Sequence, residues 1–189
     1  MNEQLNIKEM INGKPIHSRS LDLKTYPVDD DHIVVEGWLK DERFRKVYDI
    51  DGQIKDPGPV HHMAIRILVG GMPLTIIDAE AEMPHVPHHL CPSTRDSIKR
   101  VIGLEIKSGF GENVHRLIGG IEGCAHLTHL FTVMSQEALH GYWNNKMTKK
   151  PIDPGLIGDK ESLAFLVNSC QLWREGGPLI SEFKGLLDG

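Results

Sequence analysis

Two alternating apolar runs that flank a pair of glycines place the strongest constraint on the fold. Residues 60–69 precede Gly70-Gly71, and residues 74–81 follow. A period of two is typical of a strand with one buried face, and two adjacent glycines supply the positive φ angles of a tight hairpin turn. Two earlier runs, residues 16–23 and 33–39, alternate or are rich in β-branched and aromatic residues. The first part of the chain therefore predicts antiparallel strands joined by hairpins.

The second part of the chain changes to the period of helices. After a proline-broken loop, Ser93 or Thr94 can cap a helix that ends at Gly103, and a second helix is predicted around residues 111–117. A third helix is predicted over residues 124–142, with a core stripe of leucine, phenylalanine and methionine. For the apolar run 163–173 the pattern does not choose between strand and helix.

Strands followed by helices favour an α+β fold, in which an N-terminal antiparallel β-meander or curved sheet is packed by C-terminal helices. The chain has 189 residues, of which 40% are hydrophobic and 25% charged, as expected for one core. We predict a single domain, residues 1–189, with a β-rich part (14–82), a helical part (93–143) and a C-terminal extension (151–189).

Charge and hydropathy exclude several classes of partner. The formal net charge of -5 gives no basic surface for nucleic acid or an anionic membrane. No apolar run approaches the length of a spanning helix, and the N-terminus lacks the order of a signal peptide, which favours a cytoplasmic protein. Three widely spaced cysteines, including Cys170, predict reduced thiols. A small-molecule substrate is the expected partner, and the apolar C-terminal run leaves a homo-oligomer open.

Histidines and cysteines gather at three points that a fold can bring together. Thiolate and imidazole are the ligands that suit zinc or iron. The three points are a strand start, a loop and a helix start: His61-His62; His85, His88, His89 and Cys91; Cys124, His126 and His129. Adjacent strand residues face opposite ways, so at most one of His61 and His62 can enter a given site. The spacing matches no standard zinc motif, and loop histidines are commonly surface residues.

Other chemistries compete with a metal. No Gly-x-Ser-x-Gly motif and no P-loop lysine is present, which argues against a serine hydrolase and a nucleotide fold. Cys124 at a helix start, where the helix dipole favours a thiolate, could be a nucleophile with His126 as its base. Asp78 and Glu80 share one face of their strand and could supply a general base, or could simply be solvated. A non-enzymatic accessory subunit, in which the cysteines only pack, is a third hypothesis.

A series of ordered motifs resembles a bacterial family catalogued as a domain of unknown function, number 2889. The motifs include His17-Ser-Arg19, Glu36-Gly-Trp-Leu-Lys-Asp41, Val60-His-His-Met63, Asp78-Ala-Glu-Ala81, Cys91-Pro92, Ile102-Gly-Leu104, Gly119-Gly-Ile-Glu-Gly-Cys-Ala-His-Leu-Thr128 and Asn168-Ser-Cys-Gln-Leu-Trp-Arg-Glu-Gly-Gly-Pro178. The resemblance carries no settled activity.

The resemblance nevertheless ranks the candidate ligands. The residues that match the family motifs are His61, Cys91, Cys124, His126 and Cys170. His62 and His129 depart from the motifs, which tend to carry an acidic residue there, and the loop histidines fall where the pattern is loose.

These observations lead to one hypothesis and one principal alternative. The chain is expected to bind zinc or iron through Cys91, Cys124 and His126, with His61 or His129 completing the ligand set. The metal would serve a catabolic lyase or hydrolase acting on a small organic acid or aromatic substrate. His126, with Asp78 and Glu80, would take the catalytic roles. In the alternative, the enzyme is metal-free and uses Cys124 as nucleophile or His126 as general base.

Overall fold

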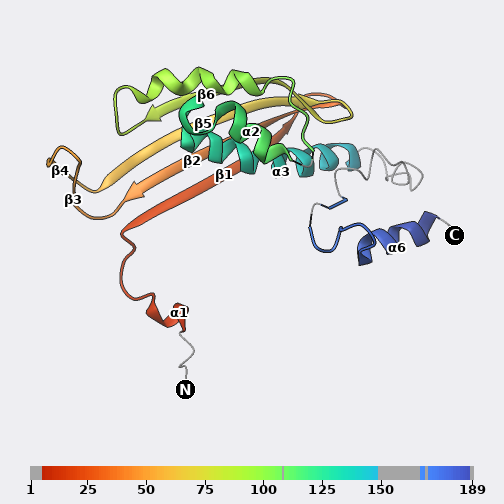
Figure 1. The fold of residues 1–189 in the computed structure, drawn as a ribbon, viewed down its shortest axis with the longest axis horizontal. Helices are drawn as coiled ribbons and strands as arrows, with labels where there is room; N and C mark the ends of the chain where they lie inside the picture. Colours follow the sequence, from red (N-terminus) through yellow and green to blue (C-terminus); the bar gives the residue numbers. More distant parts are fainter. Residues whose placement is uncertain (1–5, 108, 149–166, 169, 188–189) are drawn as a thin grey trace.

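A computed structural model describes residues 6–107, 109–148, 167–168 and 170–187 (Figure 1). Its elements, in chain order, are α1 (Ile7–Met10), β1 (His17–Pro27), β2 (His32–Arg43), β3 (Val47–Tyr48), β4 (Ile54–Lys55), β5 (Gly58–Gly70), β6 (Thr75–His85), η1 (Cys91–Val101), α2 (Phe110–Ile118), η2 (Gly120–Glu122), α3 (Ala125–Met147) and α6 (Pro178–Leu187). None of the helices in these described ranges has the length and apolarity needed to cross a membrane.

The four long strands form one antiparallel sheet in the order β1-β2-β5-β6. This order is a meander, and it confirms the predicted α+β fold with an N-terminal sheet and helices after it. The connection from β2 to β5 contains the small hairpin β3–β4, which extends beyond one end of the sheet (Figure 1). Each of the four predicted strands is present and continues past its predicted last residue. Pairing with a neighbouring strand satisfies backbone groups there that the side-chain pattern does not indicate.

Strand β2 shows why the sheet has two different faces. Its side chains alternate strictly between buried and half-buried from Ile33 to Asp41. The buried set continues on β5 at Met63, Ile65 and Ile67, and this side is called the core face. The half-buried set points to the other side, called the open face. The alternation in the sequence thus gives the sheet a packed core face and a more solvent-exposed open face.

Helix α3 packs on the core face across β1, β2 and β5, while η1 lies against β6 and α2 contacts both η1 and α3. The close approach of α3 depends on a glycine. A Cβ at Gly141 would lie 2.3 Å from Oγ1 of Thr25 on β1. Leu127, Leu130 and Phe131 on the same helix are fully buried, as the predicted stripe required.

The helical part follows the predictions closely, with one difference in type. Residues 91–101 form a 3₁₀ helix where an α-helix was expected. Helix α2 matches its predicted range within a residue, and α3 begins at Ala125 but continues five residues past its predicted end. Residues 163–166 and 169 of the run 163–173, and much of the proposed C-terminal extension, lie outside the described residues. The division of the chain into one domain therefore stays a prediction.

Candidate metal centre

A carboxylate on the core face is the centre of the site. Asp41 continues the buried alternation of β2 beyond Leu39 and is only 2% exposed. A register shift between Asp41 and Glu42 follows immediately, where β2 leaves its regular pairing with β5. Irregularities of this kind re-aim side chains at the edge of a functional site. An acidic group at the end of an apolar stripe needs partners, because an unpaired buried charge is strongly unfavourable.

Arg19 on the neighbouring strand β1 supplies the first partner. It pairs with Asp41 in the β1–β2 register. Its Nε and Nη2 donate to the two carboxylate oxygens of Asp41 at 2.6 and 2.7 Å, a bidentate ion pair. These hydrogen bonds lower the pKa of Asp41, although burial opposes them, and Asp41 in turn raises the pKa of Arg19. The carboxylate is therefore ionised throughout the neutral range.

His61 on β5 supplies the second partner, from the other side of β2. It lies opposite Asp41 in the β2–β5 register, and its Nδ1 is 2.9 Å from Oδ2 of Asp41. An ionised carboxylate only accepts hydrogen bonds, so the proton of this pair lies on Nδ1 of His61. The other ring nitrogen, Nε2, then carries the lone pair of a neutral imidazole.

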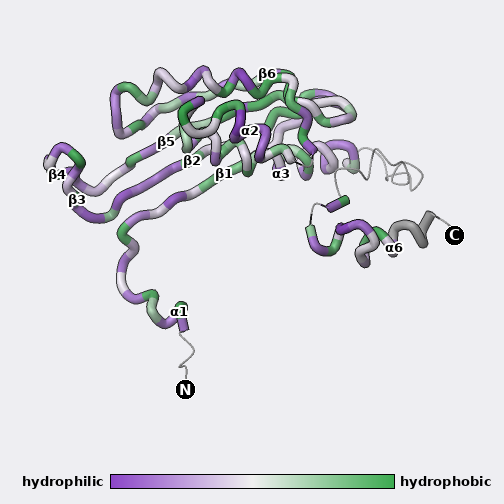
Figure 2. The backbone as a smooth tube through the Cα atoms, viewed as in Figure 1, coloured by the Kyte–Doolittle hydropathy of each residue, from purple (hydrophilic) through white to green (hydrophobic). Residues whose placement is uncertain are grey.

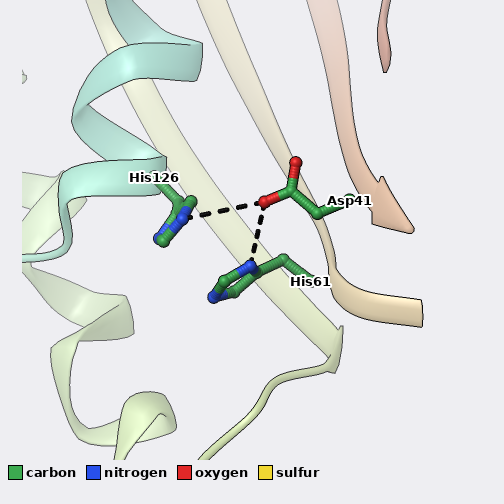
Figure 3. Close-up of side chains that lie close together, drawn as sticks. All are labelled: Asp41, His61 and His126. Atoms are coloured by element: carbon green, nitrogen blue, oxygen red, sulfur yellow. Dashed lines mark hydrogen bonds and ion pairs between the residues drawn. The ribbon is translucent and has the colours of Figure 1, made fainter. Parts of the chain in front are cut away.

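His126 completes the cluster from the first turn of α3 (Figure 3). Its Nε2 lies 3.8 Å from Oδ2 of Asp41, and its ring contacts the ring of His61 with centroids 3.7 Å apart. On its other side, Nδ1 lies 4.0 Å from Sγ of Cys124, the residue that precedes the helix. Asp41, His61 and His126 each offer one ligand atom, and these atoms lie within 4.8 Å of one another.

Both imidazoles are held in the neutral form by their surroundings. Burial is the main cause that lowers the pKa of His61, and the hydrogen bond to Asp41 offsets it only in part. Burial also lowers the pKa of His126, and repulsion from His61 and Arg19 adds to the effect. Neutral imidazole is the form that binds a metal ion or accepts a proton.

The start of α3 is fixed by the chain that leads into it. Thr128 is buried, and its hydroxyl donates to the carbonyl oxygens of Ile118 and Cys124. A Cβ at Gly123 would lie 2.6 Å from the Ile118 carbonyl oxygen, so this close approach requires glycine. The helix start is thus anchored to the end of α2, and this anchoring sets the position of His126.

The structure brings together only part of the predicted ligand set. His61 and His126 enter the cluster, and Cys124 touches it without belonging to it. The other two proposed ligands are not members of the cluster: Cys91 is the first residue of η1, and His129, one turn after His126 on α3, is exposed. Among the described residues, neither of these two takes part in a group of convergent metal ligands.

The proposed acids also lie away from the cluster. Asp78 and Glu80 are exposed on β6 and stand in register with Leu68 and Arg66, on the open face. Asp78 pairs with Lys99 at 3.0 Å, and Glu80 with Arg66 at 3.5 Å. The sheet therefore separates both carboxylates from His61, which agrees with the alternative that they are solvated.

Sequence reasoning did not select Asp41 or Arg19 as site residues. Asp41 had a visible signal, because it occupies the position in the β2 alternation where a further apolar residue is expected. Arg19 had none by itself, since an arginine on an edge strand is ordinary. Its role follows from the register that places it beside Asp41.

Fold and site together define an α+β protein with a histidine- and carboxylate-lined candidate metal centre at one end of its sheet. The chain belongs to the family described as protein of unknown function (DUF2889), whose model matches residues 17–140. That range includes Arg19, Asp41, His61 and His126. The search of curated proteins gave no match, and neither did the search of solved structures.

Proposed function

We propose that Asp41, His61 and His126 bind one divalent transition metal, zinc or iron, as the centre of a lyase or hydrolase. The observation that carries this proposal is the convergence of three ligand atoms from β2, β5 and α3 within 4.8 Å. Two imidazoles and one carboxylate are a donor set typical of catalytic zinc and of non-haem iron. Three protein ligands leave a position open for water or substrate.

The spacing of the ligand atoms suits an ion. Two atoms bound at the usual zinc distances to nitrogen and oxygen lie roughly 3.0 to 3.5 Å apart for right-angle to tetrahedral geometry. The Asp41 oxygen lies 2.9 Å from the His61 nitrogen and 3.8 Å from the His126 nitrogen, which brackets that range. On binding, an ion would take the place of the Nδ1 proton of His61, and the neutral imidazole would carry its proton on Nε2 instead.

The residues around the three ligands support the same function. Arg19 fixes the orientation of the Asp41 carboxylate, as outer hydrogen-bond partners of metal ligands commonly do. Cys124 lies at the second ring nitrogen of His126, where such a partner would orient the imidazole. A bound metal of this kind polarises a carbonyl group or generates a nucleophilic hydroxide. Either step would serve the cleavage of a small organic acid or aromatic substrate.

Metal binding can be measured directly on chelator-stripped, tag-free protein titrated with zinc, and with ferrous iron under anaerobic conditions. We expect about one equivalent to bind, with affinity reduced at least tenfold to a hundredfold in His61→Ala and His126→Ala, since each loses a ligand. His62→Ala is the matched control, because it removes a histidine from the adjacent position on the other face. Circular dichroism establishes that each variant is folded.

Cysteine ligation is tested in the same titration. Cys124→Ser and Cys91→Ser should bind metal with nearly unchanged stoichiometry, and the cobalt-substituted protein should lack the intense thiolate charge-transfer absorption. Loss of metal in either serine variant would replace the proposed ligand set by a thiolate site. Failure of the parent protein to bind zinc or iron would remove the proposal altogether.

A metal-free acid–base enzyme is the second candidate, and one observation favours it. The 2.9 Å contact between His61 and Asp41, with Arg19 behind the carboxylate, is the arrangement that orients an imidazole base. Nε2 of His61 would then take the proton, and Cys124, 4.0 Å from His126, would be the available nucleophile. Rapid alkylation of Cys124 near neutral pH in metal-free protein, slowed by His126→Ala, would support this candidate.

A further inference from the structure

A cavity of about 550 Å³ lies beside the cluster, and its lining is strongly cationic. His61 and His126 both line it. The remaining charged lining is Arg19, Arg43, Arg45 and Lys46, with Asp41 as the single acidic residue. Because Arg19 and Asp41 neutralise each other, three permanent positive charges remain around a volume typical of small-molecule sites. The protein as a whole is acidic, so this local excess is not a consequence of composition.

The charges of the two outer arginines are not balanced by carboxylates in the described part of the chain. Arg43 donates from Nε and Nη2 to the backbone carbonyl of Asp56, at 3.2 and 2.8 Å. Arg45 makes one long hydrogen bond, 3.4 Å, to the carbonyl of Lys14. These bonds leave the positive charges uncompensated, and most of the five N–H groups of Arg45 stay available.

Lys46 adds a third charge that is only weakly neutralised. Its ammonium group lies 3.3 Å from Asp56, and both side chains are more than two-thirds exposed. A pair of this kind contributes little, because water screens it and both chains lose freedom to form it. Arg43 ends β2, and Arg45 and Lys46 lie in the segment that joins β2 to β3. This part of the chain is mostly hydrophilic (Figure 2).

An apolar surface completes the cavity. Ile16 and Val47 both line it and are substantially exposed, at 62% and 39%, and Val60 lines it beside them. Ile16 precedes β1, Val47 begins β3, and Val60 lies one residue before His61 on β5. A ligand that suits this cavity therefore has both an anionic group and an apolar portion.

We infer that the cavity binds a small organic carboxylic acid. Its carboxylate pairs with Arg45 and Lys46, and its hydrocarbon portion lies on Ile16, Val47 and Val60. Arginine and carboxylate match in geometry, since the planar guanidinium donates two parallel hydrogen bonds. The bound acid then reaches His61 and His126. The contact of the acid with His61 and His126 rests on the proposed function, whereas its recognition by Arg45 and Lys46 does not.

Calorimetric titration of the metal-free, full-length protein with benzoate tests the inference. We expect benzoate to bind, and benzyl alcohol, its uncharged analogue, to bind at least roughly tenfold more weakly, because a charged hydrogen-bonded pair is lost. Arg45→Gln should weaken benzoate binding by roughly tenfold and Lys46→Gln by less. Arg95→Gln is the matched control, since this exposed arginine on η1 pairs with Asp96 and does not line the cavity.

Four outcomes would overturn the inference. The first two are the absence of benzoate binding and equal affinity for benzoate and benzyl alcohol. The third is an Arg45→Gln protein that binds benzoate as well as the parent does. The fourth is phenyl phosphate that binds more than roughly tenfold tighter than benzoate, which would assign the cavity to phosphate esters.

The metal proposal fails or stands separately. Zinc binding that persists in Arg45→Gln, together with no benzoate binding in the parent, would remove this inference and leave the metal centre. Benzoate binding that depends on Arg45, in a protein that binds no metal, would support this inference and remove the metal centre.

Discussion

His61 and His62 are neighbours on one strand, yet the sheet gives them different surroundings. His61 lies on the core face, where its side chain is 13% exposed and contacts both Asp41 and His126. His62 lies on the open face, with its ring 4.7 Å from the ring of Trp38. The difference shows that residue type does not make a site. A site also needs burial and other elements that converge on the residue, and only the core face is covered by α3.

Each face also carries an arginine bound to carboxylates, and the two arrangements differ in how deeply the carboxylates are buried. On the core face, Arg19 forms an ion pair with a single, almost fully buried carboxylate, that of Asp41. On the open face, Arg66 is shared between Glu36 at 2.7 Å and two more exposed glutamates at 3.4 and 3.5 Å. A shared, hydrated arginine tolerates the loss of one partner. A buried carboxylate that holds three cationic or polar groups does not.

The largest expected effect is the loss of the core-face carboxylate. Asp41→Asn should lower the free energy of unfolding by about 3 kcal/mol in metal-free protein, because Arg19 loses its ionic partner beside a buried amide. Glu36→Gln, the matched change on the open face, should cost about 0.5 to 1 kcal/mol, since Arg66 keeps two carboxylates. Urea unfolding measures both. Equal costs for the two variants would mean that the faces do not differ electrostatically.

The packing of helix α3 on the core face can be disturbed by one added methyl group. Gly141→Ala should destabilise the protein by about 1 to 2 kcal/mol, because a clash with Thr25 outweighs the better helix propensity of alanine. Gly111→Ala in α2 is the control, since its Cβ would meet Thr132 at an ordinary 3.6 Å. That variant should be neutral or up to about 1 kcal/mol more stable. Thermal unfolding that shows a gain for Gly141→Ala would contradict the close packing of α3.

A smaller effect is expected from pH. Burial lowers the pKa of His61 and His126 below the unfolded value of 6.5. Around and below pH 6.5 the unfolded chain therefore binds more protons than the folded one, so stability decreases as the pH falls through that value. The loss stops once the pH is below the folded pKa values.

This pH dependence can be assigned by unfolding metal-free protein between about pH 8 and pH 5. The double variant His61→Gln, His126→Gln should show a shallower decrease than the parent protein. His62→Gln should leave the slope of the parent intact, and a flattened slope in that variant would place the responsible titration on the open face.

The smallest expected effect is on the open face itself. His62→Gln should change the free energy of unfolding by less than about 0.5 kcal/mol, as is usual for a surface position without a buried partner. Metal affinity in this variant should equal that of the parent. A clear loss of metal in His62→Gln would show that the open face, and not the cluster around Asp41, holds the ion.

The amino-acid sequence by itself determined the four long strands, the helical regions that follow them and the alternation of faces along β2. Alternation in residues 33–39 and 60–69 predicted two of the paired strands, and the stripe in residues 124–142 predicted the helix that covers them. It also predicted that at most one of His61 and His62 enters a given site, because adjacent strand residues face opposite sides. His126, which the sequence singled out at a helix start, lies in the cluster with Asp41 and His61.

Only the tertiary structure decided which side chains meet. Strand register set Arg19 and His61 on either side of Asp41, and the docking of α3 brought His126 to the same carboxylate. The same packing left His129 exposed, and the β5–β6 register placed Asp78 on the open face of the sheet. Periodicity reports the side of an element that a residue occupies, but not the neighbour that faces it. That neighbour depends on pairing and packing between segments far apart in the chain.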